Sequence, residues 1–453
     1  MRKAKSIDMT SGPLLGPLIS FILPLIGASL FQQLYNTVDF LFVGNLLDRT
    51  AAAAVGASSS LITVTIGLFT GISVGTSVVA SQAMGAGDRE RAEKALHTSV
   101  TFGLVGGLVI MGLTILFSPA ILRLLRTPES VMPEALTYLR IYMLSLPFMV
   151  VYNMISEGMR AYGDSHTPFV ILVICGFVNV LMDAVFIVWI PLGVAGVSIA
   201  TVISQGLSAV LAVLWAARPE TPLRLTRGGL GVDGKVLGQV LRIGLPTGIQ
   251  TIIITFSNMM VQYYINAFGE TAVAAFATYY KVENFIYLPI LAFGQAATTF
   301  AGQNTGAGNY ARIRRGTLVT AAVGTGVVLL ISGLILIFPR TVFTWFMKDP
   351  EVVTNALKIA LVTFPFYWVY PIMEVLGGSV RGMGYAVRSM VLIILNLCVL
   401  RVGLLALFSA TFHTISSLGA VYPITWATAA VCFGVTFWLI IRKKCGEEGL
   451  LPE

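Results

Sequence analysis

Long apolar stretches, separated by short polar ones, run along almost the whole chain. Each is long enough for an α-helix to cross the hydrocarbon core of a bilayer, which takes about 20 residues. The twelve stretches cover residues 16–45, 52–80, 96–118, 135–158, 168–190, 192–217, 243–267, 272–300, 317–338, 359–380, 389–411 and 417–441. The pattern therefore predicts an all-α membrane protein in which each stretch is a transmembrane helix.

The composition excludes a soluble globular protein. Of the 453 residues, 56 % are hydrophobic and 11 % are charged, and the mean hydropathy is +0.85. Such a chain has too little polar surface to cover a soluble globule of this length. The four cysteines are scattered, so we predict neither a disulfide framework nor a cysteine metal site, and we expect no cofactor.

Lysine and arginine lie mainly on one side of the predicted spans. Of the 29 Lys and Arg residues, 20 fall in segments on the side of the N-terminus and 7 on the opposite side. By the positive-inside rule, this bias places both termini in the cytoplasm. It also accounts for the net charge of +8, so we do not expect nucleic-acid binding.

An internal repeat runs through the chain. Residues 82–88 (Gln-Ala-Met-Gly-Ala-Gly-Asp) align with residues 303–309 (Gln-Asn-Thr-Gly-Ala-Gly-Asn), 221 positions later. At nearly the same offset, the Leu-Pro pair at 23–24 aligns with the pair at 245–246. Six predicted helices lie in each half, and because six is even, both halves enter the membrane from the same side as parallel repeats.

The repeat predicts a domain organisation and a mode of action. We predict two pseudo-symmetric six-helix bundles, with an N-terminal lobe at 1–217, a cytoplasmic linker at 218–242, a C-terminal lobe at 243–441 and a cytoplasmic tail at 442–453. Two equivalent bundles on one membrane-normal axis can rock against each other and open a cleft to alternate sides. This organisation is typical of a carrier.

One acidic residue, Asp39, lies inside the first apolar stretch. Gln32, Asn36 and Asp39 follow the i, i+4, i+7 spacing of one helix face. A charge at this depth costs roughly 2.5–3.5 kcal/mol to insert, so it should face other protein or a water-filled cavity. We predict a functional role for Asp39, with a helix-packing polar contact as the alternative.

The C-terminal half carries its own charged residues within apolar stretches, namely Lys281, Glu283, Glu374 and Arg401. The repeat position that matches Asp39 is Val261, so the first carboxylate is not duplicated. Two alternatives stay open for this group. It is either a structural ion-pair network, in which Lys281 and Arg401 share a carboxylate, or a second polar site for substrate recognition or coupling.

The repeated Gly-Ala-Gly turns, the paired Leu-Pro helix starts, Asp39 and the run Asn179-Val-Leu-Met-Asp183 resemble the multidrug and toxic compound extrusion (MATE) family, in the branch related to the DNA-damage-inducible F (DinF) transporters. The resemblance covers residues 10–442. It implies a two-lobed antiporter, and not an enzyme, that exports amphipathic and often cationic organic compounds in exchange for protons or sodium ions. It also implies a cation-coupling site built from Asp39, Asn179, Asp183 and Thr201.

Helix geometry supports this grouping. At 1.5 Å per residue, Asp39, Asp183 and Thr201 lie roughly 9–14 Å inside the outer ends of their helices, and Asn179 precedes Asp183 by one turn. Two carboxylates at one place either share protons or, with the oxygens of Asn179 and Thr201, hold a sodium ion. The residues do not separate these chemistries, and the resemblance favours protons.

The expected partners are small organic molecules and the lipid bilayer, and we predict a functional monomer in a bacterial plasma (inner) membrane. One alternative function stays open. A flippase or exporter of a lipid-linked or other anionic metabolite would need a basic cleft, and Lys281 and Arg401 are the only candidates for it.

Overall fold

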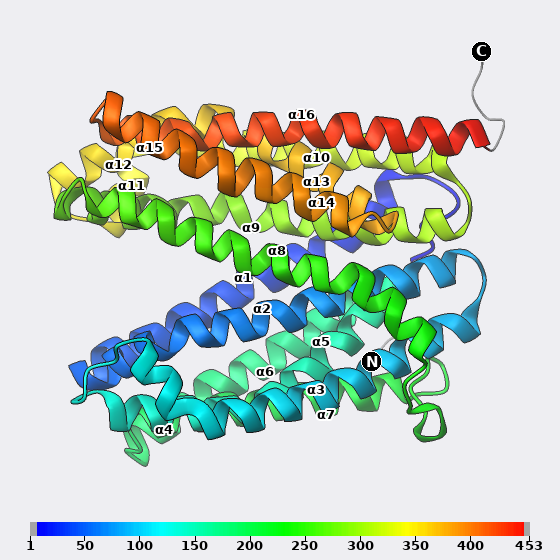
Figure 1. The fold of residues 1–453 in the computed structure, drawn as a ribbon, viewed down its shortest axis with the longest axis horizontal. Coiled ribbons are helices and arrows are strands. Elements are labelled where there is room, and N and C mark those ends of the chain that lie inside the picture. The colour runs from blue at the N-terminus through cyan, green and yellow to red at the C-terminus, as the bar shows by residue number, and fades with distance from the viewer. Residues whose placement is uncertain (1–6, 448–453) are drawn as a thin grey trace. The chain divides into compact units, whose positions relative to one another are not determined.

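The computed structural model describes residues 7–447, apart from the side chains of Phe40 and Asn45, and every regular element in that range is a helix (Figure 1). The end of the predicted tail, from residue 448 onward, lies outside the described residues. The first half of the chain forms α1 (Leu15–Leu46), α2 (Arg49–Gly85), α3 (Arg89–Leu124), α4 (Met132–Met143), α5 (Leu146–Ala161), α6 (His166–Ala184), the π-helix η1 (Val185–Trp189) and α7 (Val194–Ala216).

The second half begins after a short 3-10 helix, η2 (Arg227–Gly229), in the segment that joins the repeats. It forms α8 (Gly234–Asn266), α9 (Glu270–Gly306), α10 (Tyr310–Ile337), α11 (Pro339–Phe346), α12 (Pro350–Thr363), the 3-10 helix η3 (Phe364–Phe366), α13 (Val369–Gly382), α14 (Ala386–Ile393), the π-helix η4 (Ile394–Leu400), α15 (Arg401–Thr411) and α16 (Ile415–Glu447).

The prediction of an all-α protein with twelve spans is confirmed. Within the described range, eleven helical segments are long and apolar enough to cross a membrane. The twelfth span consists of two helices, Pro350–Phe366 and Val369–Gly382, which are bent by 55° at the break between them. Proline inside η3 and at the second residue after the start of α13 explains this break, because proline removes a backbone donor and cannot continue a regular helix.

The repeat appears in the structure as matching helix ends. α2 and α9 begin and end 221 residues apart, as do the starts of α3 and α10. In each copy the turn contains a glycine with positive φ, +72° at Gly87 and +70° at Gly308. Residues with a side chain rarely adopt this conformation, so glycine is required there. Asp88 and Asn309 then cap the following helices by accepting hydrogen bonds of 3.0 and 3.1 Å from backbone N–H groups.

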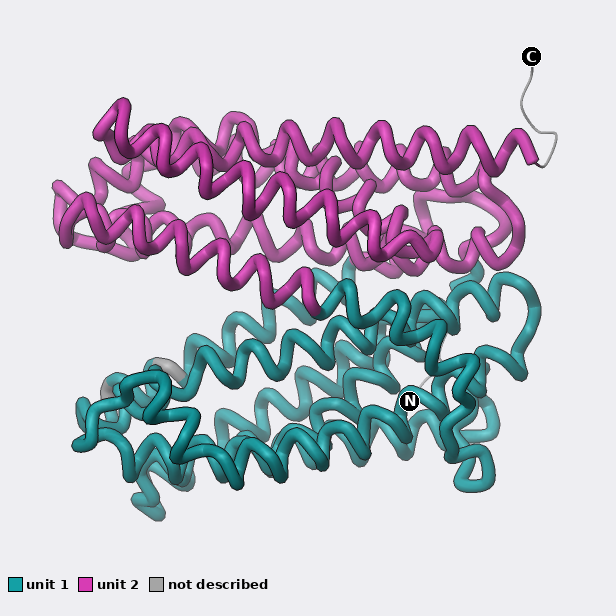
Figure 2. The backbone as a smooth tube through the Cα atoms, in the orientation of Figure 1, with its two compact units in different colours: residues 1–8, 23–248 teal, residues 9–22, 249–453 magenta. Residues whose placement is uncertain are grey.

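The chain divides into two compact units, shown in different colours in Figure 2. Unit 1 contains residues 1–8 and 23–248, and unit 2 contains residues 9–22 and 249–453. This division passes through α1 and α8, whereas the predicted lobes meet at the 218–242 linker. The lobes at 1–217 and 243–441, joined by a linker at 218–242, therefore remain a prediction.

Close contacts inside each unit explain why the division passes through these helices. In unit 1, Gly71 and Gly75 of α2 lie against Gly248 and Gly244 of α8, so closely that a side chain at either α2 position would meet the α8 backbone. In unit 2, the Arg312 guanidinium donates to the carbonyl oxygens of Met9, Ser11 and Gly12 at 3.0, 2.7 and 2.8 Å. These bonds attach the start of the chain to α10.

Candidate functional site

α1 and α6 approach each other closely inside unit 1. A Cβ atom added at Gly176 would overlap the ring of Phe31, and one added at Gly27 would lie 3.1 Å from the ring of Phe169. Glycine at these two positions lets an aromatic ring of one helix lie directly on the other. Asp39 lies two turns after Phe31 in α1, and Asn179 lies one turn after Gly176 in α6. The contact between the two helices therefore brings Asp39 next to Asn179.

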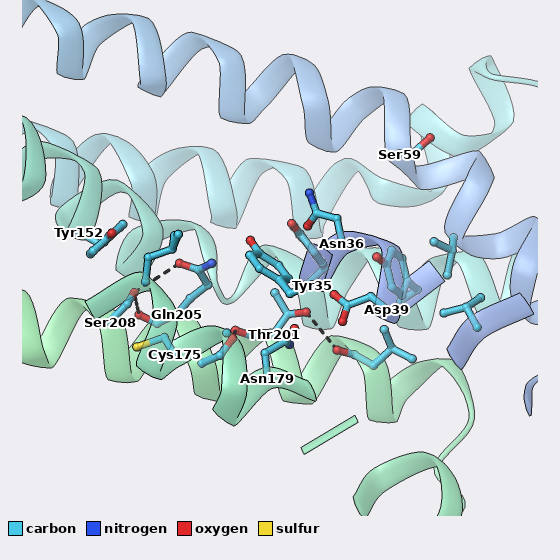
Figure 3. Close-up of a pocket in the computed structure, with 18 residues that line it drawn as sticks. Tyr35, Asn36, Asp39, Ser59, Tyr152, Cys175, Asn179, Thr201, Gln205 and Ser208 are labelled. Carbon is cyan, nitrogen blue, oxygen red and sulfur yellow. Dashed lines mark hydrogen bonds between the residues drawn. The ribbon is translucent and has the colours of Figure 1, made fainter. Parts of the chain in front are cut away.

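The Asn179 amide faces the Asp39 carboxylate, and its orientation is assigned from the hydrogen bonds that each choice allows. When its amide nitrogen faces α1, it donates to both carboxylate oxygens of Asp39, at 3.1 and 3.2 Å. The opposite orientation would place the amide oxygen against those oxygens, where two acceptors repel each other. The view in Figure 3 shows the two side chains facing each other between α1 and α6.

Asp183 lies directly beside this pair and is 0 % exposed. Among the described residues, neither of its carboxyl oxygens has a hydrogen-bond donor. Its carboxyl group is close enough to that of Asp39 for the two to interact directly. The π-helix η1 begins two residues later, and such a π-helical turn is frequent at functional sites.

Asp39, Asn179 and Thr201 line one cavity of about 410 Å³ within unit 1. The Thr201 hydroxyl donates to the carbonyl oxygen of Val197 at 3.1 Å, which leaves its lone pairs free to accept. Asp183 does not line the cavity but lies behind Asp39. The structure thus brings together all four residues of the predicted coupling site, while their role in coupling stays a prediction.

The cavity also holds side chains that the sequence reasoning missed. The most prominent are four tyrosines from three elements, together with serine and glutamine residues of α7: Tyr35, Tyr138, Tyr142, Tyr152, Ser204, Gln205 and Ser208 (Figure 3). Tyr35 precedes Asp39 by one helical turn, and this spacing alone is a signal that could have found it. Of the two other predicted polar residues of α1, Asn36 lines the cavity, whereas Gln32 is exposed and does not.

The charged residues of the C-terminal half, all in unit 2, do not form one network of direct ion pairs. Glu283 accepts hydrogen bonds from the hydroxyls of Tyr279 and Tyr367, at 3.2 and 2.9 Å. Glu374 instead forms a 2.9 Å salt bridge with Arg381 of its own helix. The hydrogen-bond and ion-pair partners of Glu283 and Glu374 therefore differ in kind from those of Asp39 and Asp183 in unit 1.

The two cations proposed to share a carboxylate are in different surroundings. Arg401 is 5 % exposed, and its guanidinium lies 4.9 Å from the ring centroid of Tyr422 and 3.4 Å from the hydroxyl of Thr425. Lys281 is exposed. Within the part of the chain that the structure describes, neither forms a salt bridge, so they share no carboxylate through direct contact.

The anionic-metabolite alternative finds no support in this arrangement. No lysine or arginine lines the cavity of unit 1. The two basic residues on which that alternative depended do not form a common basic surface. Among residues 7–447 there is also no group of three or more His, Cys, Asp and Glu side chains that could hold a metal ion.

Comparison with known proteins shows the family. The MatE family model matches the chain twice, over residues 24–185 and 246–407. The chain is 30 % identical over 412 residues to the probable multidrug resistance protein YpnP of Bacillus subtilis (strain 168), covering 90 % of this chain and 91 % of that relative. It is 24 % identical over 414 residues to the probable multidrug resistance protein NorM of Thermotoga maritima, covering 89 % and 87 %.

Solved structures show the same fold. An outward-facing multidrug resistance transporter of the MATE family aligns with a TM-score of 0.92 at 21 % identity, covering 98 % of this chain and 99 % of that chain. A MATE structure in the straight conformation aligns with a TM-score of 0.91 at 22 % identity, again covering 98 % and 99 %. These relatives do not distinguish the DinF-related branch. Two family matches, a similar curated relative and the shared fold agree, and the chain belongs to the MATE family of multidrug efflux transporters, which are membrane carriers and not enzymes.

Proposed function

We propose that this protein is an antiporter that exports amphipathic organic cations in exchange for protons, with coupling at Asp39 and Asp183. The observation that carries the proposal is the pair of neighbouring carboxyl groups, of which Asp39 lines the cavity and Asp183 is buried beside it. Two neighbouring acids in a low-dielectric interior share protons, because both cannot stay ionised at little cost. Loss of the proton leaves negative charge beside the cavity, where an organic cation can take its place.

Each of the four residues has a separate part in this scheme. Asp39 lines the cavity and is the group that meets the substrate and the proton. Asp183 is buried behind it and holds the proton that the pair shares. The Asn179 amide donates to Asp39 and so supports its ionised form. The Thr201 hydroxyl offers a further acceptor at the cavity wall.

Sodium is the competing coupling ion. The oxygens of Asp39, Asn179 and Thr201 are the kind of ligands that a hard cation binds. The two ions are therefore distinguished by imposing a pH gradient and a sodium gradient separately.

The tyrosines support an organic cation as the substrate. The cavity volume of about 410 Å³ falls in the usual range for small-molecule sites, roughly 300–1,000 Å³. Aromatic faces attract cationic groups, and the carboxylate of Asp39 supplies the opposite charge. Ring surfaces also tolerate varied apolar shapes, which suits the export of several compounds.

We also propose that both termini lie in the cytoplasm of a bacterial cell, with the spans in the plasma membrane. The excess of lysine and arginine on the side of the termini supports this orientation. All four coupling residues belong to unit 1 of a single chain. This completeness supports a functional monomer.

The test is efflux of a fluorescent organic cation from proteoliposomes under a pH gradient or a sodium gradient, each imposed alone. We expect the wild-type protein to respond to the pH gradient and Asp39→Asn to lose that response. Asp48→Asn is the matched control, because Asp48 is an exposed cap of α2 and asparagine caps a helix equally well. Wild-type efflux in Asp39→Asn would contradict the coupling role, and a response to the sodium gradient alone would contradict the proton.

A further inference from the structure

The segment that joins the two repeats is attached to α3 by a histidine outside the carboxylate site. His97 lies in the third turn of α3 and is 5 % exposed. Its Nε2 atom accepts a hydrogen bond of 2.9 Å from the backbone N–H of Thr226. A Cβ atom added at Gly229 would lie 2.6 Å from the same nitrogen. Residues 226–229 therefore close over one edge of the ring.

The hydrogen bonds determine the protonation state of this ring. A backbone N–H can only donate, so Nε2 must present its lone pair to Thr226. The hydrogen of the neutral ring is then on Nδ1, which lies 2.7 Å from the carbonyl oxygen of Glu93 and donates to it. With the segment attached, His97 is therefore neutral and in one defined tautomer.

A second proton on this ring is incompatible with the attached segment. It would bind at Nε2 and point at the N–H of Thr226, so that two donors face each other. The Thr226 hydroxyl is 3.4 Å from Nε2 and could accept from it only if the backbone N–H turned away. Protonation therefore removes the acceptor of a partly buried backbone donor and adds a charge next to it.

The neighbouring charged groups already have partners. Glu93 accepts hydrogen bonds from the Arg89 side chain at 3.1 Å and from the backbone N–H of Arg224 at 3.4 Å. Lys94 pairs with Glu90 at 2.7 Å. The two ion pairs lie within α3, and of these contacts only the bond from Arg224 joins α3 to the segment, two residues before Thr226.

The remaining acid at this contact is Asp233. Its carboxylate accepts from the backbone N–H groups of Lys235 and Val236 at 2.9 and 3.1 Å, and these bonds lower the pKa of Asp233 below its ordinary value. The stability contributed by Asp233 is therefore present above its ordinary pKa and is lost only as the pH falls through its lowered value. Between pH 5.5 and 7.5 an imidazole is the type of side chain that ordinarily changes charge.

We infer that His97 is a proton-operated latch, in which binding of a proton at Nε2 releases residues 226–233 from α3. The backbone N–H of Asp233, which donates to the Thr98 hydroxyl at 3.1 Å, marks the far end of this segment. α8 begins at the next residue, so release loosens the segment that leads into α8, while α8 itself stays attached through the bond from Arg91 to Gln239 at 3.0 Å and the contact of Gly75 with Gly244. The latch senses pH on the side of the membrane where the segment lies, and it does not depend on which ion drives transport.

The chain offers a simple experimental design, because it contains only three histidines, His97, His166 and His413. The full-length protein in lipid nanodiscs is labelled with ¹³C-histidine and titrated by NMR, and His97→Gln assigns the His97 signal. In parallel, hydrogen exchange of residues 221–233 is measured at pH 7.5 and pH 5.5 and corrected for the intrinsic pH dependence of exchange.

In the wild-type protein we expect exchange of residues 226–233 to rise roughly three- to tenfold at pH 5.5, as loss of one hydrogen bond implies, with a midpoint that matches the NMR titration of His97. His97→Gln should remove the rise, because a glutamine oxygen accepts from Thr226 at both pH values. His166→Gln is the control and should behave as wild type.

Two results would overturn the inference. One is a wild-type exchange profile that does not change with pH, and the other is a pH-dependent rise that persists in His97→Gln. Gly229→Ala gives a second test that needs no titration, since its methyl group would displace the segment and raise exchange at both pH values. Wild-type protection in Gly229→Ala would show that the segment does not close over the ring and would equally contradict the latch.

Discussion

In unit 1 and unit 2 the Gly-Ala-Gly turns have the same geometry, whereas the buried carboxylates have different surroundings. Gly87 and Gly308 differ by only 2° in φ, and each turn ends in a side chain that caps the next helix. Asp39, in contrast, has an amide donor and a second carboxyl group beside it. Glu283 has two tyrosine hydroxyls. Turn geometry follows from chain connectivity and is kept in both copies of the repeat. A buried charge is kept only where a hydrogen-bond partner or counter-charge neutralises it or where it has a function.

The means of neutralisation differ between the units. In unit 1 no lysine or arginine lines the cavity, and under the proposed coupling a proton or a cation from outside the protein balances the negative charge of the aspartates. In unit 2 the tyrosine hydroxyls donate to Glu283 and the Arg381 guanidinium pairs with Glu374, so the protein itself supplies partners for both carboxylates. The comparison therefore predicts transport defects for changes in unit 1 and stability defects for changes in unit 2.

The largest expected effect concerns the two aspartates of unit 1. Asp39→Asn and Asp183→Asn should each stop gradient-driven efflux, because either change prevents the pair from sharing a proton. Since the two carboxyls act as one unit, the double variant should differ from each single variant by less than about twofold. Efflux rates in proteoliposomes measure this. Independent, multiplicative losses in the double variant would show that the aspartates do not act together.

The next largest effect is expected when the buried Arg401 of unit 2 is replaced. Arg401→Met should lower the free energy of unfolding by about 1–3 kcal/mol, because it removes the contact with the Tyr422 ring and the hydrogen bond to Thr425 and leaves the Thr425 hydroxyl without this donor. Adding Glu283→Gln should restore part of that loss if the charge of Glu283 also depends on Arg401. Thermal and denaturant unfolding in detergent measure both values.

A control for this experiment lies in the same unit. Arg388 contacts the ring of Tyr385 at 4.9 Å, the same distance as Arg401 from Tyr422, but Arg388 is exposed. Arg388→Met should therefore cost only about 0.5–1 kcal/mol. A fully stable Arg401→Met variant that has lost transport would instead indicate a second coupling or recognition site in unit 2.

A smaller effect tests how α1 and α6 position the carboxylates. Gly176→Ala should destabilise unit 1 by about 1–3 kcal/mol, because the new methyl group overlaps the ring of Phe31. It should also slow efflux by moving Asp39 away from Asn179, and Phe31→Leu should partly restore both properties. Gly206→Ala in α7 is the control, since nothing lies within 4 Å of its added methyl group. Equal effects of the two glycine changes would argue against the role of this contact.

The smallest expected effect concerns the helix caps that follow the Gly-Ala-Gly turns in both units. Asp88→Ala and Asn309→Ala each remove a helix cap and should each cost about 1 kcal/mol of unfolding free energy. Only the loss at Asp88 should diminish at high salt, because its charge also interacts with the dipole of α3. Unfolding at low and high ionic strength measures this difference. A large transport defect in either variant at normal stability would show that these turns do more than end and begin helices.

The positions of the spans and the repeat could be predicted from sequence, because both depend on residues close together in the chain. Apolar length determines where a helix can cross a bilayer, and the alignment of residues 82–88 with 303–309 needs no knowledge of the fold. The four residues of the predicted coupling site were also named from motif resemblance, and the structure brings them together. The ion pair of Glu157 and Arg160, at 2.6 Å, likewise follows from a three-residue spacing.

Only the tertiary structure decided which other side chains share the site. Tyr138, Tyr142 and Tyr152 line the cavity with Asp39, while Gln32, on the same predicted face of α1, does not. Arg401 is buried and Lys281 exposed, although both lie in apolar stretches. Hydropathy along a chain determines the depth of a residue in the membrane, but the rotation of each helix about its axis depends on packing. In unit 1 that rotation is set by contacts such as Phe31 on Gly176, between residues far apart in sequence.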